Sequence, residues 1–289
     1  MSSARRVMLP MVLAAFLTSP ALWAGQEDAG TPMTPLALID GAIADGRLDA
    51  AEEIIRRAPL EVRDPELRLR QAEIALARGR MAEALTGFGL LIDEPAVAAR
   101  AHQGLGISRL RRDQIDEAKE ALDTALALDP GLLRAQRARA AVADRERDWK
   151  RADAAYAAAL ALAPGDAETL SNRGWSRMLR GEHAAAEADL MAALSADPAL
   201  EVAAGNLRLA RAMQGKYQQA FEGSTRETLA ADLNTVGFAA MSRGDLDIAE
   251  AYFRRAMMIN PVYDRTAAAN LSWVEAERAR LATAGAPKK

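Results

Sequence analysis

The amino-acid sequence predicts an all-α fold built from a helix-turn-helix unit that recurs about every 34 residues. Alanines recur at steps of 33, 34, 34, 34, 34 and 29 residues, at Ala51, Ala84, Ala118, Ala152, Ala186, Ala220 and Ala249. Glycines precede five of them by five residues, at Gly46, Gly79, Gly181, Gly215 and Gly244. Prolines follow four of them by twelve residues, at Pro130, Pro164, Pro198 and Pro261. A unit of this length cannot bury its own apolar face, so the units must stack on one another.

The composition supports this prediction and excludes several classes of partner. Half of the 289 residues are hydrophobic but only 4% are aromatic, and this suits closely packed, alanine-rich helices better than a sheet. The net charge of −3 gives no electrostatic reason to expect nucleic acid as a ligand. Because the chain contains no cysteine, it has no disulfide, no thiolate metal ligand and no lipid-modified cysteine.

The N-terminal segment, residues 1–24, has the pattern of a Sec-type signal peptide. Arg5 and Arg6 precede an apolar run, and small residues follow that favour cleavage after Ala21 or after Ala24. The alternative, an uncleaved membrane anchor, is disfavoured because the apolar run is much shorter than the roughly 20 residues that span a bilayer. Arginine far outnumbers lysine, as in GC-rich bacterial genomes, so we expect a periplasmic protein with no membrane span after cleavage.

The rest of the chain divides into a linker, seven repeats, a capping helix and a tail. We expect a flexible linker over residues 25–31, a capping helix within 264–282 and a disordered tail over 283–289. Within each repeat, helix A covers about the first fourteen residues and helix B begins near the seventeenth. The repeats are placed at 32–64, 65–98, 99–132, 133–166, 167–200, 201–229 and 230–263.

The positions that pack within each unit resemble those of the tetratricopeptide repeat (TPR) family. Position 8 is small at Ala72, Gly106, Ala140, Gly174 and Gly237. Position 24 is bulky at Ile55, Phe88, Leu122, Tyr156, Leu190 and Phe253. The resemblance implies a right-handed superhelix, an α-solenoid, of about seven units plus a C-terminal capping helix. It also implies that the protein binds other proteins.

The sixth repeat departs from the pattern because it is five residues short. Ser224 and Glu227 replace the bulky and the small residue of positions 24 and 27, so its second helix must be cut short or bent. The spacing of these two residues is that of a capping box at a helix start. We therefore predict a break before the seventh repeat, followed by a helix from about Thr225 to about Ser242.

No motif in the sequence indicates catalysis, a cofactor or a metal. The chain lacks a G-x-S-x-G elbow, a G-x-x-x-x-G-K loop and a cysteine nucleophile. The histidines, His102 and His183, fall at positions where the family packs large side chains, so packing is favoured over metal ligation. Acidic clusters at residues 113–120 and 144–148 fit helix caps better than catalytic pairs.

A peptide-binding groove follows from the resemblance, which places positions 2, 5, 6, 9 and 12 of each helix A on a concave surface. These positions hold Arg100, Gln103, Arg134, Arg137, Asn172, Trp175, Met178, Asn206, Asn234, Phe238 and Met241. Asparagine amides can pair with the backbone of an extended peptide, and Trp and Met offer apolar anchors. The alternative is that the aromatic and methionine side chains pack between helices and the arginines are merely solvated. The carboxylate clamp of some family members is not reproduced, since it uses lysines that are nearly absent here.

The C-terminal third also resembles the TadD-type TPR proteins of tight-adherence (Flp) pilus systems. The resemblance lies in the segments AMQGKY, NTVGFAAMSRGD, AYFRRA and ANL. It implies a non-enzymatic periplasmic scaffold that assists pilus assembly and has secretin components among its partners. Two alternatives stay open: an adaptor or regulator in cell-wall or outer-membrane biogenesis, and an enzyme with a polar site in the groove.

Overall fold

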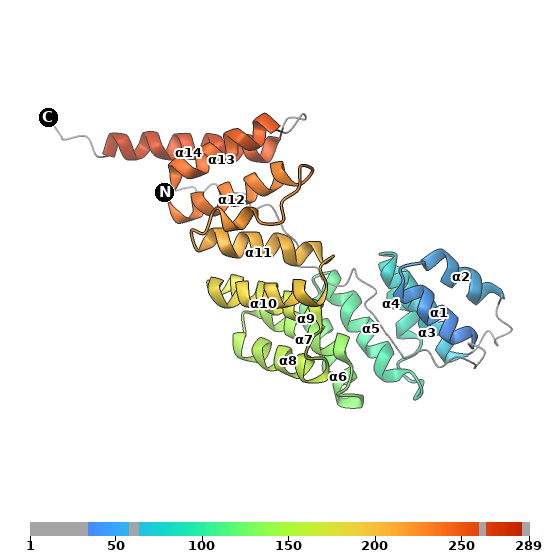
Figure 1. Cartoon of the computed structure of the whole chain (residues 1–289). Coiled ribbons are helices and arrows are strands. Elements are labelled where there is room, and N and C mark those ends of the chain that lie inside the picture. Colours follow the sequence, from blue (N-terminus) through green and yellow to red (C-terminus); the bar gives the residue numbers. More distant parts are fainter. Residues whose placement is uncertain (1–33, 58–63, 260–263, 285–289) are drawn as a thin grey trace. The chain divides into compact units, whose positions relative to one another are not determined.

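A computed structural model of the protein describes residues 34–57, 64–259 and 264–284 (Figure 1). Over these residues the chain forms fourteen α-helices and one short 3-10 helix, without any strand. The all-α prediction is therefore confirmed. The predicted signal peptide, the linker and residues 285–289 lie outside the described residues, and α14 continues through residues 283 and 284 of the predicted tail.

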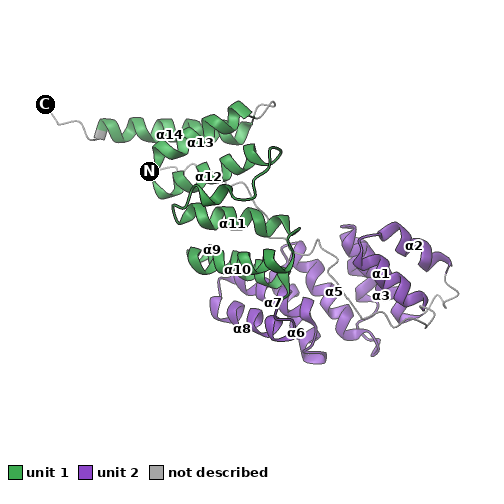
Figure 2. Ribbon diagram, in the orientation of Figure 1, with its two compact units in different colours: residues 1–14, 165–289 green, residues 15–164 purple. Residues whose placement is uncertain are grey.

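The described chain forms two compact units, which are coloured separately in Figure 2. The N-terminal unit (purple) contains α1 (Pro35–Ala44), α2 (Leu48–Arg57), α3 (Pro65–Ala77), α4 (Met81–Gly89), α5 (Ala98–Arg111), α6 (Ile115–Leu128), α7 (Leu133–Glu146) and α8 (Trp149–Leu162). The C-terminal unit (green) contains α9 (Ala167–Leu179), α10 (His183–Ala196), α11 (Glu201–Met213), η1 (Gln219–Phe221), α12 (Leu229–Arg243), α13 (Leu246–Ile259) and α14 (Arg265–Ala284). Odd-numbered helices up to α11, together with α12, are the A helices of successive repeats.

Each turn between helix A and helix B contains one residue in the left-handed conformation. Five of these residues are glycines, with φ between 70° and 84°. In repeats three and four the same position holds Asp113 and Arg147, with φ of 60° and 56°. Because a side chain disfavours positive φ, these two turns carry backbone strain that the glycine turns avoid. The regular spacing of these glycines in the sequence therefore reflects the need for a left-handed residue at each turn.

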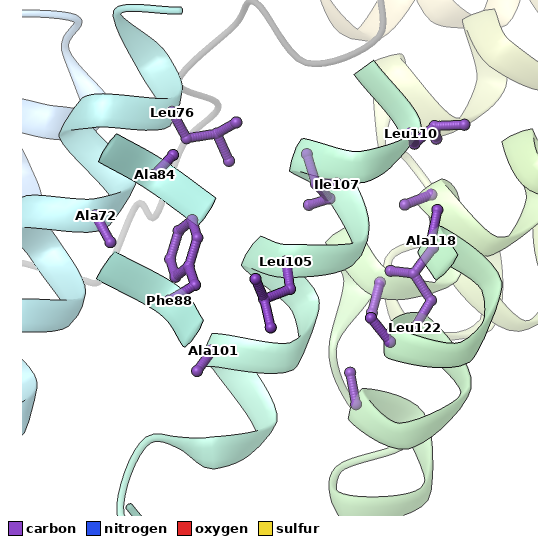
Figure 3. Packing of buried hydrophobic residues seen from close by; sticks show 14 of the residues in the cluster. Ala72, Leu76, Ala84, Phe88, Ala101, Leu105, Ile107, Leu110, Ala118 and Leu122 are labelled. Atoms are coloured by element: carbon purple, nitrogen blue, oxygen red, sulfur yellow. The ribbon is translucent and has the colours of Figure 1, made fainter. Parts of the chain in front are cut away.

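The repeated alanines and bulky residues form the core of each unit. All seven alanines of the opening series are at most 1% exposed. In repeats two to five and seven the bulky position-24 residue packs against the small position-8 residue of its own repeat, so that a Cβ atom on Gly106 would lie 2.5 Å from the Cγ atom of Leu122. Figure 3 shows Phe88 in the same role, between Ala72 and the helix that carries Ala101 and Leu105. Small residues thus create the sockets that the bulky side chains fill.

Polar side chains at the helix starts satisfy backbone amides that have no partner within the helix. Thr34 caps α1 by accepting a hydrogen bond from the amide of Ala37. The neighbouring Pro35 occupies the first turn of α1, where a missing N–H is tolerated. Asp148 caps α8 in the same way, whereas Asp144, in the same acidic cluster, accepts a hydrogen bond from the hydroxyl of the buried Tyr156. The cluster at 144–148 therefore supplies one cap and one buried hydrogen bond.

The sixth repeat is interrupted, but its following helix begins later than predicted. Only η1 stands where the other repeats have helix B, and α12 starts at Leu229, about one turn after Thr225. The cap is also shifted by one residue from the Ser224–Glu227 pair. Thr225 and Thr228 exchange hydrogen bonds between amide and hydroxyl, at 3.0 and 3.3 Å. A hydroxyl at the fourth position of the cap replaces the carboxylate that the capping-box spacing suggested.

Candidate functional site

The A helices of the N-terminal unit carry a linked set of ion pairs. Arg70 on α3 pairs with Asp40 on α1, with distances of 2.8 and 2.9 Å to its two carboxylate oxygens. Glu66 receives hydrogen bonds from both Arg70 and Arg100. Arg100, which the sequence places in a basic groove, is thus already neutralised by a carboxylate of the same unit.

Glu73 and Arg134 lie near these ion pairs but form no ion pair themselves. Neither side chain has an ion pair or hydrogen bond within the described part of the chain. Burial raises the pKa of the Glu73 carboxyl above its ordinary value, and the positive charges of Arg134, Arg70 and Arg100 oppose that rise. Burial and the charge of Arg134 both lower the pKa of Arg111. Arg134 therefore forms no direct ion pair, although its charge acts on the nearby carboxyl of Glu73.

The four groove residues predicted in this unit differ in exposure. Arg134 is exposed and Arg100 is partly buried, whereas Gln103 and Arg137 are each only 6% exposed. Among the four, Arg134 is the one whose charged group is open to a ligand.

The A helices of the C-terminal unit carry a row of buried asparagines. The three predicted residues, Asn172, Asn206 and Asn234, lie on α9, α11 and α12 and are 7%, 1% and 7% exposed. The structure adds Asn270 on α14, which is 4% exposed. Sequence reasoning missed Asn270 because the capping helix was interpreted only as a cover for the last repeat. We call these four residues the asparagine row.

Several amide atoms of the asparagine row have no hydrogen-bond partner. They are the amide nitrogen and oxygen of Asn206, the oxygen of Asn234 and the nitrogen of Asn270. A buried polar atom without a partner costs about 1–3 kcal/mol, so each such atom in a folded protein calls for an explanation by water, an ion or a ligand. The row thus offers both donors and acceptors whose hydrogen-bonding capacity is unused.

The predicted apolar groove residues pack in two clusters beside the row. Trp175 and Met178 are partly buried against a core that includes Leu209 and Ala212. Phe238 and Met241 are 9% and 6% exposed and belong to another core cluster, together with Ala240, Ala249, Phe253, Leu271 and Val274. Trp175 and Met178 therefore keep more exposed surface than Phe238 and Met241 do.

Neither histidine lies in a metal site within the described residues, where no group of three His, Asp or Glu side chains could hold an ion. Burial lowers the pKa of both imidazoles, with help from the charges of Arg109 near His102 and of Arg243 near His183. The same part of the chain contains no helix that is long and apolar enough to cross a membrane.

Comparison with solved structures places this arrangement among the helical repeat solenoids. A crystal structure of the APC/C hetero-tetramer Cut9-Hcn1 matches 84% of this chain at 16% identity, with a TM-score of 0.61. The chain spans only 49% of that protein's length. A tetratricopeptide repeat protein from Parabacteroides merdae matches 83% of this chain and 97% of its own at 15% identity, with a TM-score of 0.53.

A third solved structure is the C-terminal part of a TPR repeat-containing protein from Cytophaga hutchinsonii. It matches 82% of this chain and 99% of its own at 13% identity, with a TM-score of 0.51. No protein-family model and no curated protein matches the sequence. The chain therefore has the tetratricopeptide repeat fold, which confirms the resemblance seen in positions 8 and 24.

Proposed function

We propose that the protein is a non-enzymatic periplasmic scaffold that holds an extended peptide segment of a protein partner along its A helices. The partner belongs to a cell-envelope secretion or Flp/Tad pilus machine, and secretin components are the first candidates. The observation that carries the proposal is the unused hydrogen-bonding capacity of Asn206, Asn234 and Asn270. The N-terminus resembles a signal peptide, which supports export. The resemblance of the C-terminal third to TadD-type proteins supports the pilus role.

The asparagine row suits the backbone of an extended peptide. Each peptide unit carries one donor and one acceptor, and a side-chain amide can satisfy both. Because the row lies on three successive A helices and on the capping helix α14, its amides recur along the stack at intervals set by the helix packing. Trp175 and Met178 supply apolar surface for the side chains of the peptide. Arg134 supplies a separate positive charge in the N-terminal unit.

A peptide-binding experiment tests the groove. Extended peptides from a synthetic library are measured by fluorescence anisotropy against the full chain and against Asn206→Leu and Asn270→Leu. Each substitution replaces an amide with an apolar group of similar size, so helix content is retained while affinity falls about tenfold for each hydrogen bond lost. Lys150→Glu, on the exposed side of the B helix α8, is the control and leaves affinity unchanged. Equal affinity in all variants would remove the row from the binding site.

A crosslinking experiment in living cells tests the cellular setting. Crosslinked partners are identified by mass spectrometry from cells that produce the full chain. The proposal expects secretion or pilus components of the envelope. Recovery of cytoplasmic proteins alone would contradict export, and recovery of cell-wall enzymes would favour the adaptor alternative over the pilus role.

A further inference from the structure

Three polar side chains of the N-terminal unit form no hydrogen bond or ion pair within the described residues. They are Glu73 on α3, Gln103 on α5 and Arg134 on α7. Helix α5 packs against both α3 and α7, so the three side chains come from successive A helices (Figure 1). They stand at positions 9, 5 and 2 of their repeats, which the family resemblance places on the concave surface. We call these residues the polar trio.

Glu73 is the acidic residue on its face of α3 that no arginine pairs with directly. Glu66, Arg70 and Glu73 share one face of the helix, since they are four and three residues apart. Arg70 donates to Asp40 at 2.8 and 2.9 Å and also to Glu66. Glu66 receives a second hydrogen bond from Arg100. These arginines are therefore committed to Asp40 and Glu66, and Glu73 is left without a donor.

Two further arginines lie near Glu73. Arg111 donates to the carbonyl oxygen of Leu76, three residues beyond Glu73, at 2.8 Å. Burial lowers the pKa of Arg111, and repulsion from Arg134 lowers it further. The charge of Arg134 also opposes the rise that burial causes in the pKa of Glu73. An anion on Arg134 would offset its repulsion of Arg111.

Gln103 and Glu73 add hydrogen-bonding groups to this charge. Gln103 is only 6% exposed, and a buried amide without a hydrogen bond calls for a partner. The Glu73 carboxyl is partly buried, and burial favours its protonated form, which can donate a hydrogen bond. The guanidinium, the amide and the protonated carboxyl can therefore all donate to one acceptor.

We propose that the polar trio binds the side-chain carboxylate of an acidic residue in a partner peptide. Arg134 supplies the positive charge, Gln103 an N–H donor and the protonated Glu73 an O–H donor. The bound carboxylate stays ionised, and Glu73 takes up one proton from solvent. This inference rests on the proposed function, because it names the chemistry of a peptide held along the A helices, but it uses no residue of the asparagine row.

Binding should tighten as pH falls, because Glu73 must carry a proton in the complex. The charges that act on Glu73 come from Arg134 on α7, Arg70 on α3, Asp40 on α1 and Arg100 on α5. The charged groups of α2 and α4 pair among themselves or with Arg78 and Arg80. Because the pKa of Glu73 lies above its ordinary 4.5, Glu73 takes up its proton at a pH where a solvated carboxylate stays ionised.

A pair of peptides tests the site. An end-capped library peptide that binds the full chain and contains a single glutamate is resynthesised with glutamine in its place. Both are measured by fluorescence anisotropy at about pH 5.5 and about pH 8. We expect the glutamate peptide to bind at least about tenfold more tightly at the lower pH, with a smaller preference at the higher pH.

Three variants assign this preference to the trio. Arg134→Gln should remove it at both pH values. Glu73→Gln, whose amide can donate at every pH, should keep it at both. Arg112→Gln is the matched control, since Arg112 is an exposed arginine of the same unit in the turn between α5 and α6, and it should leave the preference unchanged. Circular dichroism of each variant separates loss of the site from loss of the fold.

Equal affinity of the two peptides for the wild-type chain would overturn the proposal. A preference that survives Arg134→Gln, or that is lost equally in Arg112→Gln, would overturn it too. If the glutamine peptide binds as tightly once its C-terminal carboxylate is left free, the trio recognises a chain end instead. Asn206→Leu separates this inference from the asparagine row, because it should weaken both peptides and leave their ratio intact. Unchanged affinity in that variant would count against the row alone.

Discussion

Arg208 on α11 and Asp232 on α12 join the sixth repeat to the seventh through a buried ion pair. The Nη1 atom of Arg208 lies 2.8 Å from the Oδ1 atom of Asp232, and the two side chains are 11% and 6% exposed. The other carboxylate oxygen of Asp232 accepts a hydrogen bond of 2.8 Å from the Thr228 hydroxyl. Arg208 stands at position 8 of its repeat, which is a small residue in repeats two to five and seven.

The buried ion pair and the shortening of the sixth repeat are structurally linked. In repeats two to five and seven a bulky residue of helix B fills the socket above a small residue of helix A, as Leu190 does above Gly174. In the sixth repeat position 24 is Ser224 and position 8 is Arg208. A long side chain from helix A thus accompanies the loss of the bulky one from helix B, and α12 supplies its counter-charge.

Replacing Asp232 with Asn should strongly destabilise the C-terminal unit. The change leaves the buried Arg208 without its counter-charge, and such a loss costs about 3–5 kcal/mol. Burial already lowers the pKa of Arg208, and the charge of Asp232 opposes this effect. Urea unfolding followed by circular dichroism measures the change. The double variant Arg208→Met, Asp232→Leu should recover most of the stability, and a double variant as unstable as Asp232→Asn would contradict this account.

Replacing Arg147 with Gly should stabilise the fourth repeat. Arg147 adopts φ of 56° in the turn between α7 and α8, and a side chain at such an angle costs about 1 kcal/mol relative to glycine. The melting temperature should therefore rise. Gly181→Ala is the reverse control, since Gly181 has φ of 75° at the equivalent turn and open space around it. Its melting temperature should fall, and a change of the same sign in both variants would argue against backbone strain.

Replacing Gly106 with Ala should destabilise the third repeat by about 1–3 kcal/mol, because overpacking forces neighbouring atoms apart. The added Cβ atom would lie 2.5 Å from Cγ of Leu122 and 3.2 Å from the carbonyl oxygen of Ala118. Gly89→Ala serves as the control, since no atom lies within 4 Å of its Cβ position. Thermal melting of both variants checks the prediction. Equal stability of the two would show that the socket above Gly106 can relax.

Replacing Glu187 with Gln should make stability less dependent on pH in mild acid. Burial opposes ionisation of Glu187, but hydrogen bonds from Lys216, Gln214 and Arg211 outweigh it and lower the pKa of the carboxyl. A lowered pKa contributes stability that is present above the ordinary value of 4.5 and is lost as pH falls through the folded value. Wild type should therefore exceed the variant in melting temperature near neutral pH. The difference should shrink as pH falls below 4.5, and a constant difference would contradict the assignment.

The period and packing of the repeats could be predicted from sequence because each repeat applies the same steric rule. Gly106 and Leu122 must match in size within one repeat, and the turn before helix B must accept a left-handed residue. The start of α12 was displaced because Thr225 and Thr228 form their own reciprocal cap, which competes with the pattern of Ser224 and Glu227. Local hydroxyl pairing of this kind depends on the chain direction after Gly223, which spacing alone does not encode.

The candidate site was less accessible to sequence reasoning. A position number indicates which face of a helix a residue occupies, but it cannot indicate which neighbour already satisfies the residue. The sequence correctly places a charged side chain at Arg100, but Glu66, one repeat earlier, neutralises that charge. Nothing in the sequence around Asn206 distinguishes it from a solvent-exposed asparagine. Only the packing shows that its amide is buried and has no hydrogen-bond partner. These properties depend on contacts between repeats.

The charged junction between α11 and α12 also determines where the C-terminal unit can open. In a repeat array each element is held by its nearest neighbours, so stability varies from junction to junction. The junction between α11 and α12 depends on the buried ion pair of Arg208 and Asp232 in addition to apolar packing. Loss of this ion pair is therefore expected to loosen helices α12 to α14 as one group.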